Sequence, residues 1–521
     1  MSLNCSARRQ ALVTLRTKTN CTHRCLRSLS SSATEPSGNR GLGTESPSGK
    51  RKERVVILGS GWAGYALART LDPAKFDRVV VSPRSHFVFT PLLASTAVGT
   101  LEFRAVAEPV RRIRQVIFQQ GWADDVDFTR KVVRVEASID DDAASHTTIP
   151  VPEPATIPGK AVIPTTPHKG PMIDVPYDKL VVAVGAYSQT FNIDGVREHA
   201  HFLRDVGDAR RIRLRILALF EHCASNPTIS DEQKRELLHF AVVGGGPTGI
   251  EFAAELHDLI YEDLIKVYPG LVPLVRITVY DIAPAVLPMF DKELAGYAME
   301  LFNRRGIEIR TEHHLQAIRA EGDGLKLKIK EHGDQEVGAG MVVWSTGLMQ
   351  HPLVKKLVDN QVHDQGSNPN SPLRLKSDPK TGAIVTDGHM RAQITENASR
   401  GQSPRMDDVF VIGDCAFCEA DQSLPKTGQV ASQQAVYLAK ALNSGNLDES
   451  KPFSFRNWGT MAYLGGWRAI HQSSADELKG RAAWVLWRTA YLTKSLSVRN
   501  KIIVPFFWFI SWLFGRDISR F

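Results

Sequence analysis

Two glycine-rich segments, each between a short apolar run and a helix-forming stretch, are the clearest sign of chemistry in this chain. Residues 59–64 read Gly-Ser-Gly-Trp-Ala-Gly and residues 244–249 read Gly-Gly-Gly-Pro-Thr-Gly. Such spacing permits a tight turn, and it brings a pyrophosphate close to the unpaired N–H groups at a helix start. The candidate phosphate-binding glycines are Gly59, Gly61, Gly64, Gly244, Gly246 and Gly249. Because both loops have the strand–loop–helix context, the chain is predicted to hold two dinucleotides at once.

An acidic residue follows the second predicted strand of the second unit. The apolar run 276–280 ends at Asp281, where a carboxylate accepts from both hydroxyls of an adenosine ribose and repels a 2′-phosphate. This favours NADH over NADPH. The corresponding strand of the first unit, 78–81, is followed by Ser-Pro-Arg. The usual ribose contact is therefore not assigned there, although Arg84 is kept as a candidate cofactor contact.

Further glycine-ended strands indicate how the domains are ordered. The run 179–184 leads to Gly185, and the similar run 341–346 leads to Gly347, so each nucleotide unit closes with the same element. The run 408–412 then leads to Asp414 at the mouth of a predicted last strand, where open α/β sheets bind ligands. We predict an α/β fold with two Rossmann-like domains, the second inserted in the first. The expected ranges are 54–200 and 348–445 for the outer domain, 201–347 for the inserted domain and 446–521 for a C-terminal domain.

The charge of the chain is concentrated at its N-terminus. The formal net charge is +8, and residues 1–54, with eleven Lys or Arg and three acids, account for all of it. The first 34 residues contain no acid and are rich in Arg, Ser and Thr, which is typical of a mitochondrial transit peptide. A disordered basic tail is the alternative. Residues 1–53 are therefore predicted to be a transit peptide and linker, and the neutral remainder argues against a nucleic-acid partner.

The cysteines indicate no disulfide framework. Three of the six lie in the predicted presequence, which leaves Cys223, Cys415 and Cys418. The Cys-x-x-Cys at 415–418 is either a redox pair or a pair of incidental small residues. We favour incidental residues, because residues 59–110 carry no cysteine where disulfide reductases place theirs.

The motifs together resemble the two-dinucleotide flavoproteins, and more closely the type II (alternative) NADH:ubiquinone oxidoreductases of fungal and plant mitochondria. The motifs that carry the resemblance are 89–93, 244–252, 343–347, 413–416 and 514–521. The resemblance implies FAD on the outer domain, NADH on the inserted domain and ubiquinone as the acceptor, without proton pumping. It places Thr90, Pro91, Gly185 and Asp414 at FAD, with Gly347 at NADH.

The resemblance also implies a quinone site. The segment 424–435 is close to the family's helix with glutamines four residues apart, which makes Lys426, Gln429 and Gln433 candidate site residues. This spacing puts both amides on one helical face, although a plain polar face is the alternative. The family has Ala where Gly428 stands. Glu251 is expected near the junction of flavin, nicotinamide and quinone, where it orients a ring or routes a proton, whereas its alternative role is to stabilise a helix start.

The C-terminal segment is predicted to anchor the protein to a membrane. Aromatic residues and basic residues alternate after Gly480, and the apolar run 502–514 is too short to span a bilayer. We expect helices lying in the headgroup region of the inner mitochondrial membrane, on the matrix side, with packing on the body or in a homodimer as the alternative. No metal site or calcium loop is expected. A sulfide:quinone oxidoreductase and an apoptosis-factor-like NADH-binding flavoprotein are the alternative functions.

Overall fold

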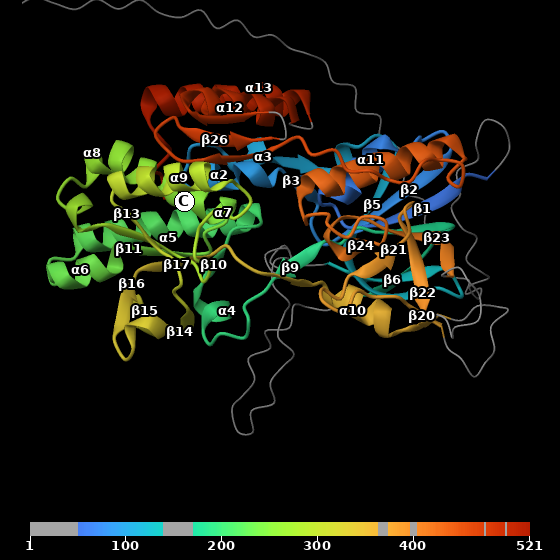
Figure 1. Ribbon diagram of the computed structural model, residues 1–521, viewed down its shortest axis with the longest axis horizontal. Helices are drawn as coiled ribbons and strands as arrows, with labels where there is room; N and C mark the ends of the chain where they lie inside the picture. Colours follow the sequence, from blue (N-terminus) through green and yellow to red (C-terminus); the bar gives the residue numbers. More distant parts are fainter. Residues whose placement is uncertain are drawn as a thin grey trace, which may run out of the picture. The chain divides into compact units, whose positions relative to one another are not determined.

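The computed structural model describes residues 51–138, 170–362, 373–395, 404–473, 476–494 and 497–520. Nearly all of the predicted transit peptide lies outside the described residues, and so does most of the proline-rich stretch before residue 170. The described chain forms two nucleotide-binding domains, each built on its own sheet, and a C-terminal domain of a small sheet and two helices (Figure 1).

The first sheet is a twelve-stranded mixed sheet with parallel strands at its centre. Strand β1 pairs in parallel with β2 and β8, and β8 pairs in parallel with β23. Its strands are β1 (Glu53–Leu58), β2 (Phe76–Ser82), β5 (Val116–Asp127), β6 (Val132–Ala137), β7 (Met172–Pro176), β8 (Lys179–Val182), β19 (Gln361–Val362), β20 (Leu373–Leu375), β21 (Ile384–Thr386), β22 (Arg391–Thr395), β23 (Arg405–Val411) and β24 (Ala416–Cys418). The carboxyl halves of the central strands β1, β2, β8 and β23 are buried and largely apolar, as parallel strands covered on both faces require.

Helices cover this sheet and position its loops. Helix α11 packs along α1, which follows the first glycine loop. The helices of this part of the chain are α1 (Trp62–Thr70), α2 (Leu93–Ala97), α3 (Phe103–Val106), α10 (Pro352–Asp359) and α11 (Gly428–Ser444). The short paired strands β3 (His86–Val88) and β4 (Ala107–Pro109) lie between β2 and β5 along the chain. The start of α11 is thereby held beside the glycine loop.

The second sheet has five parallel strands in the order β10–β17–β11–β12–β13. Its strands are β10 (His201–Phe202), β11 (His239–Val243), β12 (Arg276–Tyr280), β13 (Ile307–Arg310) and β17 (Met341–Trp344), and an antiparallel sheet adds β14 (Leu315–Glu321), β15 (Gly324–Ile329) and β16 (Glu336–Ala339). The helices are α4 (Val196–His199), α5 (Val206–Ser225), α6 (Asp231–Leu237), α7 (Pro247–Asp258), α8 (Ile265–Val267) and α9 (Lys292–Arg304), with a π-helical stretch at Leu259–Leu264 between α7 and α8.

The second domain is inserted in the first, as predicted. Strands β8 and β23 are neighbours in the first sheet, yet the whole second sheet is built from residues between them. The chain leaves the first domain through β9 (Ala186–Ser188) and returns to it through β18 (Leu348–Gln350). These two strands pair antiparallel. The two crossings are therefore hydrogen-bonded to each other.

The C-terminal domain consists of the antiparallel strands β25 (Thr460–Tyr463), β26 (Ala469–Gln472) and β27 (Glu477–Gly480), followed by α12 (Arg481–Lys494) and α13 (Val498–Phe514). The two helices lie side by side (Figure 1). Trp487 of α12 and Trp508 of α13 are buried, whereas Ile502, Phe506, Phe509 and Leu513 of α13 are each more than half exposed. In the described chain no helix has the length and apolar character needed to cross a membrane.

Candidate active site

The three glycines of the first loop occupy three different environments. Gly59 has φ +110°, and a Cβ built on it would lie 2.4 Å from the carbonyl oxygen of Ala183. A Cβ on Gly64 would lie 2.0 Å from the carbonyl oxygen of Gly59, whereas a Cβ on Gly61 would meet nothing within 4 Å. Gly59 thus makes the turn, Gly64 lets the helix pack on the loop, and Gly61 faces open space that a pyrophosphate can approach.

The second loop repeats this arrangement. Gly244 has φ +113°, a Cβ on Gly249 would lie 2.0 Å from the oxygen of Gly244, and Gly246 faces open space. In both α1 and α7 the N-cap residue is a glycine without a capping side chain, and the first turn contains no acid. The unpaired N–H groups of both helices are therefore available to an anion. Both loops fit a dinucleotide.

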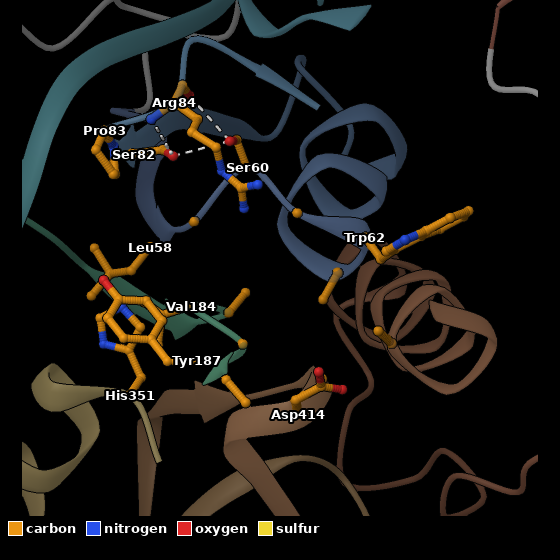
Figure 2. Close-up of a pocket in the computed structure, with 18 of the residues that line it drawn as sticks. Leu58, Ser60, Trp62, Ser82, Pro83, Arg84, Val184, Tyr187, His351 and Asp414 are labelled. Atoms are coloured by element: carbon orange, nitrogen blue, oxygen red, sulfur yellow. Dashed lines mark hydrogen bonds between the residues drawn. The ribbon is translucent and has the colours of Figure 1, made fainter. Parts of the chain in front are cut away.

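A cavity opens over the first loop, at the carboxyl ends of β1, β2 and β8 (Figure 2). Of the predicted FAD contacts, Gly59, Gly61, Arg84, Thr90, Gly185 and Asp414 line it. Gly64 and Pro91 are not among the lining residues, and Pro91 is the middle residue of the 3₁₀ turn Thr90–Leu92. Further lining residues are Trp62 of the glycine loop, Ala431 of the segment 424–435, and four residues that no motif indicated: Trp122, Tyr187, Arg204 and His351.

The end of β2 is held by a polar network rather than by an acid. Ser60 Oγ lies 3.0 Å from Ser82 Oγ and donates to the carbonyl oxygen of Arg84 over 3.1 Å (Figure 2). Arg84 Nη1 forms an ion pair with Asp205 at 3.0 Å. Arg204, the residue before Asp205, also lines the cavity. Its Nη1 is buried and has no hydrogen-bond partner in the described chain. An orphaned guanidinium nitrogen in this wall suits the negative charge of a flavin dinucleotide.

Asp414 lines the opposite end of the cavity, and Lys426, which is not a lining residue, lies close enough to influence its carboxyl. Asp414 follows β23 at the mouth of the sheet, and burial raises the pKa of its carboxyl while Arg204 and Lys426 oppose that shift. Lys426 Nζ donates to the carbonyl oxygen of Ala416, and burial lowers the pKa of its amine. Gly185 has φ +72° and open space where a side chain would be. Gly185 and the charged Asp414 therefore form part of the cavity wall near β9.

Asp281 lies at the second loop, as predicted for a ribose-binding acid. Its carboxylate accepts from the backbone N–H of Gly245 and, over 2.7 Å, from that of Ala283. The acid at the end of β12 is thus fixed beside the loop that faces the pyrophosphate. Gly347, with φ +77°, follows β17 at the same edge of the sheet.

Glu251 is buried where α7 meets the C-terminal domain. Its Oε1 accepts from the backbone N–H of Tyr463 at 3.0 Å and from Trp487 Nε1 at 3.3 Å. Burial raises the pKa of Glu251 to about 8. A carboxyl group with this pKa exchanges a proton near neutral pH. It is not part of the wall of the cofactor cavity.

A row of aromatic rings connects Glu251 with that cavity. The ring centroids of Trp487 and Tyr491 are 5.0 Å apart, those of Tyr491 and Phe89 are 6.0 Å apart, and those of Phe89 and Trp62 are 5.2 Å apart. Trp62 lines the cofactor cavity and donates to Thr90 Oγ1 over 3.0 Å. No sequence pattern indicated this row, because α12 is far from both glycine loops along the chain.

The two predicted quinone-site glutamines both lie on α11, but they contact a backbone segment. Gln429 donates to Gly459 O over 2.8 Å and accepts from Trp458 N at 3.3 Å. Gln433 pairs with both backbone groups of Arg456, at 2.9 and 3.0 Å. Each amide therefore has one remaining N–H, and both side chains fix the segment 456–459 along α11.

The next residue on α11 has a role that sequence reasoning missed. Gln434 is buried, and its Oε1 accepts from the backbone N–H of Gly413 over 2.7 Å. It thereby fixes the turn that carries Asp414. Gly428, at the start of the same helix, faces Trp62: a Cβ there would lie 2.9 Å from the indole ring. The large residue in the first glycine loop accounts for the small residue at this position.

With this geometry in place, comparisons identify the class of protein. The family model described as pyridine nucleotide-disulphide oxidoreductase matches residues 53–435, and the NDH2 C-terminal domain model matches residues 458–517. A probable NADH dehydrogenase of Dictyostelium discoideum is 38% identical over 474 residues, covering 90% of this chain and 91% of that protein. The external alternative NAD(P)H-ubiquinone oxidoreductase B1 of Solanum tuberosum, a mitochondrial protein, is 33% identical and covers 93% of each chain.

A solved structure agrees with the fold. The NDH2 of Plasmodium falciparum in complex with NADH superposes with a TM-score of 0.74 at 23% identity, covering 90% of this chain and 100% of that one. The chain belongs to the pyridine nucleotide-disulphide oxidoreductase family and, within it, to the alternative NADH:ubiquinone oxidoreductases. The predicted fold, with its two cofactors FAD and NADH, is confirmed.

Proposed function

We propose that this protein oxidises NADH and reduces ubiquinone, with FAD as the intermediate carrier and without proton pumping. The overall reaction converts NADH, one proton and a quinone into NAD⁺ and a quinol. The observation that carries the proposal is the pairing of two complete dinucleotide loops with a buried carboxyl, Glu251, that is linked to the first cavity by aromatic rings. FAD supplies the redox chemistry, since a flavin accepts a hydride and passes electrons to a quinone.

In this proposal the chain's own residues bind the two dinucleotides, orient the quinone and supply its proton. Asp281 and the glycines of the second loop hold NADH, and the first loop with Arg84, Arg204 and Asp414 holds FAD. Glu251 holds the proton that the quinol requires, because burial keeps its carboxyl protonated up to about pH 8. Lys426 and the remaining amide hydrogens of Gln429 and Gln433 donate toward the quinone oxygens.

We place the quinone along the row formed by Trp62, Phe89, Tyr491 and Trp487. Flat aromatic faces at these separations suit a planar ring. The row ends at α12, which packs beside the exposed apolar face of α13. A lipophilic substrate can then pass from a membrane into the protein without crossing water, with α12 and α13 lying in the headgroup region.

The proposal extends to location and domain ranges. The relatives' names support a mitochondrial protein, and we propose association with the matrix side of the inner membrane. We keep 54–200 and 348–445 as the FAD domain, 201–347 as the NADH domain and 446–521 as the membrane-facing domain. Dimerisation through the aromatic C-terminal helices is compatible with this arrangement and is tested by the mass of the purified protein.

The alternative as a sulfide:quinone oxidoreductase is disfavoured by the cysteines. Cys415 and Cys418 are both buried free thiols, and burial raises the pKa of the Cys415 thiol to about 11. A thiol with that pKa is protonated at neutral pH and is a poor nucleophile. The test of the proposed function is steady-state turnover of FAD-loaded protein with NADH and a ubiquinone analogue. One quinol per NADH is expected, and NADH consumption without quinol would contradict it.

A further inference from the structure

A second cavity lies apart from the cofactor cavity and shares no lining residue with it. Its volume is about 400 Å³. It lies between the end of α7 with its π-helical extension, Leu259–Leu264, and the helices α12 and α13. Short π-helical stretches often occur at functional sites. Trp487, at the end of the proposed quinone row, also lines this cavity, whereas Trp62, Phe89 and Tyr491 of that row do not.

Arg488 of α12 lines this cavity between two tryptophans. Its Cζ lies 4.4 Å from the ring centroid of Trp484 and 4.3 Å from that of Trp508. Trp467 closes a third side at 6.0 Å. No hydrogen bond or ion pair to Arg488 occurs in the described part of the chain, and its Nε is buried without an acceptor. The guanidinium is fixed in orientation by stacking, while its N–H groups lack a protein partner.

The acidic groups of the cavity wall are already engaged. Glu255 accepts from Ser95 Oγ at 2.5 Å and from Thr100 Oγ1 at 3.0 Å. Glu262 and Asp263 each accept from Arg516 Nη1 at 2.8 Å. Lys266 forms a longer contact of 3.7 Å with Asp263. What the wall still offers is therefore a hydrogen-bond donor, the guanidinium of Arg488, which calls for a ligand with acceptor oxygens.

The part of the rim formed by the C-terminal end of α13 is apolar and continues into the exposed face of that helix. Trp512, Leu513 and Phe514 line the cavity and are 62%, 53% and 76% exposed. Leu513 also belongs to the exposed stripe with Ile502, Phe506 and Phe509. A ligand seated on Arg488 can thus extend an apolar part over this end of α13.

We propose that this cavity is a binding site for an acidic phospholipid, whose phosphate is held by Arg488 while its acyl chains lie over Trp512, Leu513 and Phe514. A guanidinium binds phosphate oxygens in a fork, and stacking between Trp484 and Trp508 presents that fork ready for binding. The proposal rests on the membrane association proposed above. It differs from general surface attraction in assigning one headgroup to one side chain.

The experiment uses full-length, FAD-loaded protein in detergent, titrated with phosphatidylglycerol or phosphatidylcholine and followed by native mass spectrometry. The variants are Arg488→Gln and, as a control of equal charge change on the same helix, the exposed Arg481→Gln. Wild type and R481Q should bind one phosphatidylglycerol in preference to phosphatidylcholine. R488Q should bind it at least about tenfold more weakly, since a charged hydrogen bond is lost.

Several outcomes would overturn the proposal. Equal weakening in R481Q and R488Q would indicate general electrostatics, and inorganic phosphate binding as tightly as the lipid would assign the site to free phosphate. Displacement of the lipid by a short-chain ubiquinone would assign it to the substrate. If R488Q loses its flavin, Trp508→Leu is tested in its place, and the same weakening of phosphatidylglycerol binding is expected. A wild-type protein without NADH:quinone activity that still retains one phosphatidylglycerol would refute the proposed function alone.

Discussion

The indole N–H of Trp487 donates to Oε1 of Glu251 over 3.3 Å and thereby joins the C-terminal helix α12 to α7 of the NADH domain. The backbone N–H of Tyr463 donates to the same oxygen at 3.0 Å. Two donors on Oε1 favour Oε2 as the oxygen that carries the proton. Because burial raises the pKa of this carboxyl to about 8, the protonated form predominates at neutral pH.

Replacing Glu251 with Gln should lower kcat for quinone reduction by about a hundredfold, the size of effect typical of a lost proton donor. In the wild type kcat should fall as the pH rises through about 8, since the proton is then lost from the carboxyl. The variant should lack this fall. Steady-state rates with a ubiquinone analogue across this pH range are the measurement, and an E251Q profile that keeps the wild-type shape would refute the role.

The same carboxyl makes stability depend on pH. Its folded-state pKa of about 8 lies above the ordinary value of 4.5, so the folded protein retains a proton that the unfolded chain loses. The stabilisation is complete below pH 4.5 and is lost as the pH rises through about 8. The free energy of unfolding, measured in urea, should therefore fall more steeply between pH 4.5 and 8 for wild type than for E251Q. Identical pH dependences for the two proteins would contradict the assignment.

The indole ring of Trp62 is predicted to leave room only for glycine at position 428. A Cβ at residue 428 would lie 2.9 Å from the indole ring, so Gly428→Ala should lower the free energy of unfolding by about 1–3 kcal/mol. Trp62→Leu should remove most of that penalty when combined with it. The control is Gly270→Ala, where a Cβ meets nothing within 4 Å. Denaturant titration of wild type, the two single variants, the double variant and the control tests the coupling, and additive losses would speak against it.

Asp281 is predicted to select the nicotinamide nucleotide. Asp281→Asn should raise the KM for NADH about ten- to a hundredfold, as expected when charged hydrogen bonds to a ribose are lost. The change should leave kcat nearly constant. It should also reduce the preference for NADH over NADPH, because the repulsion of a 2′-phosphate is removed. Kinetics with both nucleotides check this. A fall in kcat with unchanged KM would place Asp281 elsewhere in the reaction.

The exposed stripe of α13 is predicted to hold the protein at a membrane. Phe506 and Phe509 are more than half exposed, and changing both to Asp should abolish cosedimentation with vesicles while NADH oxidation with a water-soluble quinone stays within about twofold. Val267→Asp, at an exposed apolar residue of α8, is the control. Unchanged cosedimentation of the double variant, or equal loss in the control, would refute an anchor on this helix.

The nucleotide-binding parts were predictable from sequence because local spacing encodes them. Three glycines at fixed intervals after an apolar run specify a turn, an open position and a close helix contact, and both loops have this geometry. The insertion of one domain in the other followed from the repeated glycine-ended strands, and the sheet topology confirms it. The position of Asp281 beside the second loop was predictable for the same reason, since its place is counted from a strand end.

Residues brought in by tertiary contact were not predictable in this way. Arg204 reaches the cofactor cavity from the loop before α5, and nothing in its neighbours distinguishes it from a surface arginine. Gln429 and Gln433 were predicted to line a quinone site, and their pairing with the backbone of 456–459 was not foreseen. That segment has no periodicity, so its contact with α11 leaves no local signal. The strands β25–β27 were missed because β26 (Ala-Ile-His-Gln) and β27 (Glu-Leu-Lys-Gly) lack the continuous apolar run that marks the strands of the nucleotide-binding domains.

The central claim is tested most directly by anaerobic stopped-flow absorbance of the FAD-loaded protein. Mixing with NADH should bleach the flavin rapidly, NADPH should do so more slowly, and sulfide should leave it oxidised because Cys415 and Cys418 are buried thiols. A ubiquinone analogue added next should restore the oxidised spectrum within the turnover time. Bleaching by sulfide but not by NADH, or a stable NADH-reduced complex that the quinone does not reoxidise, would contradict the account.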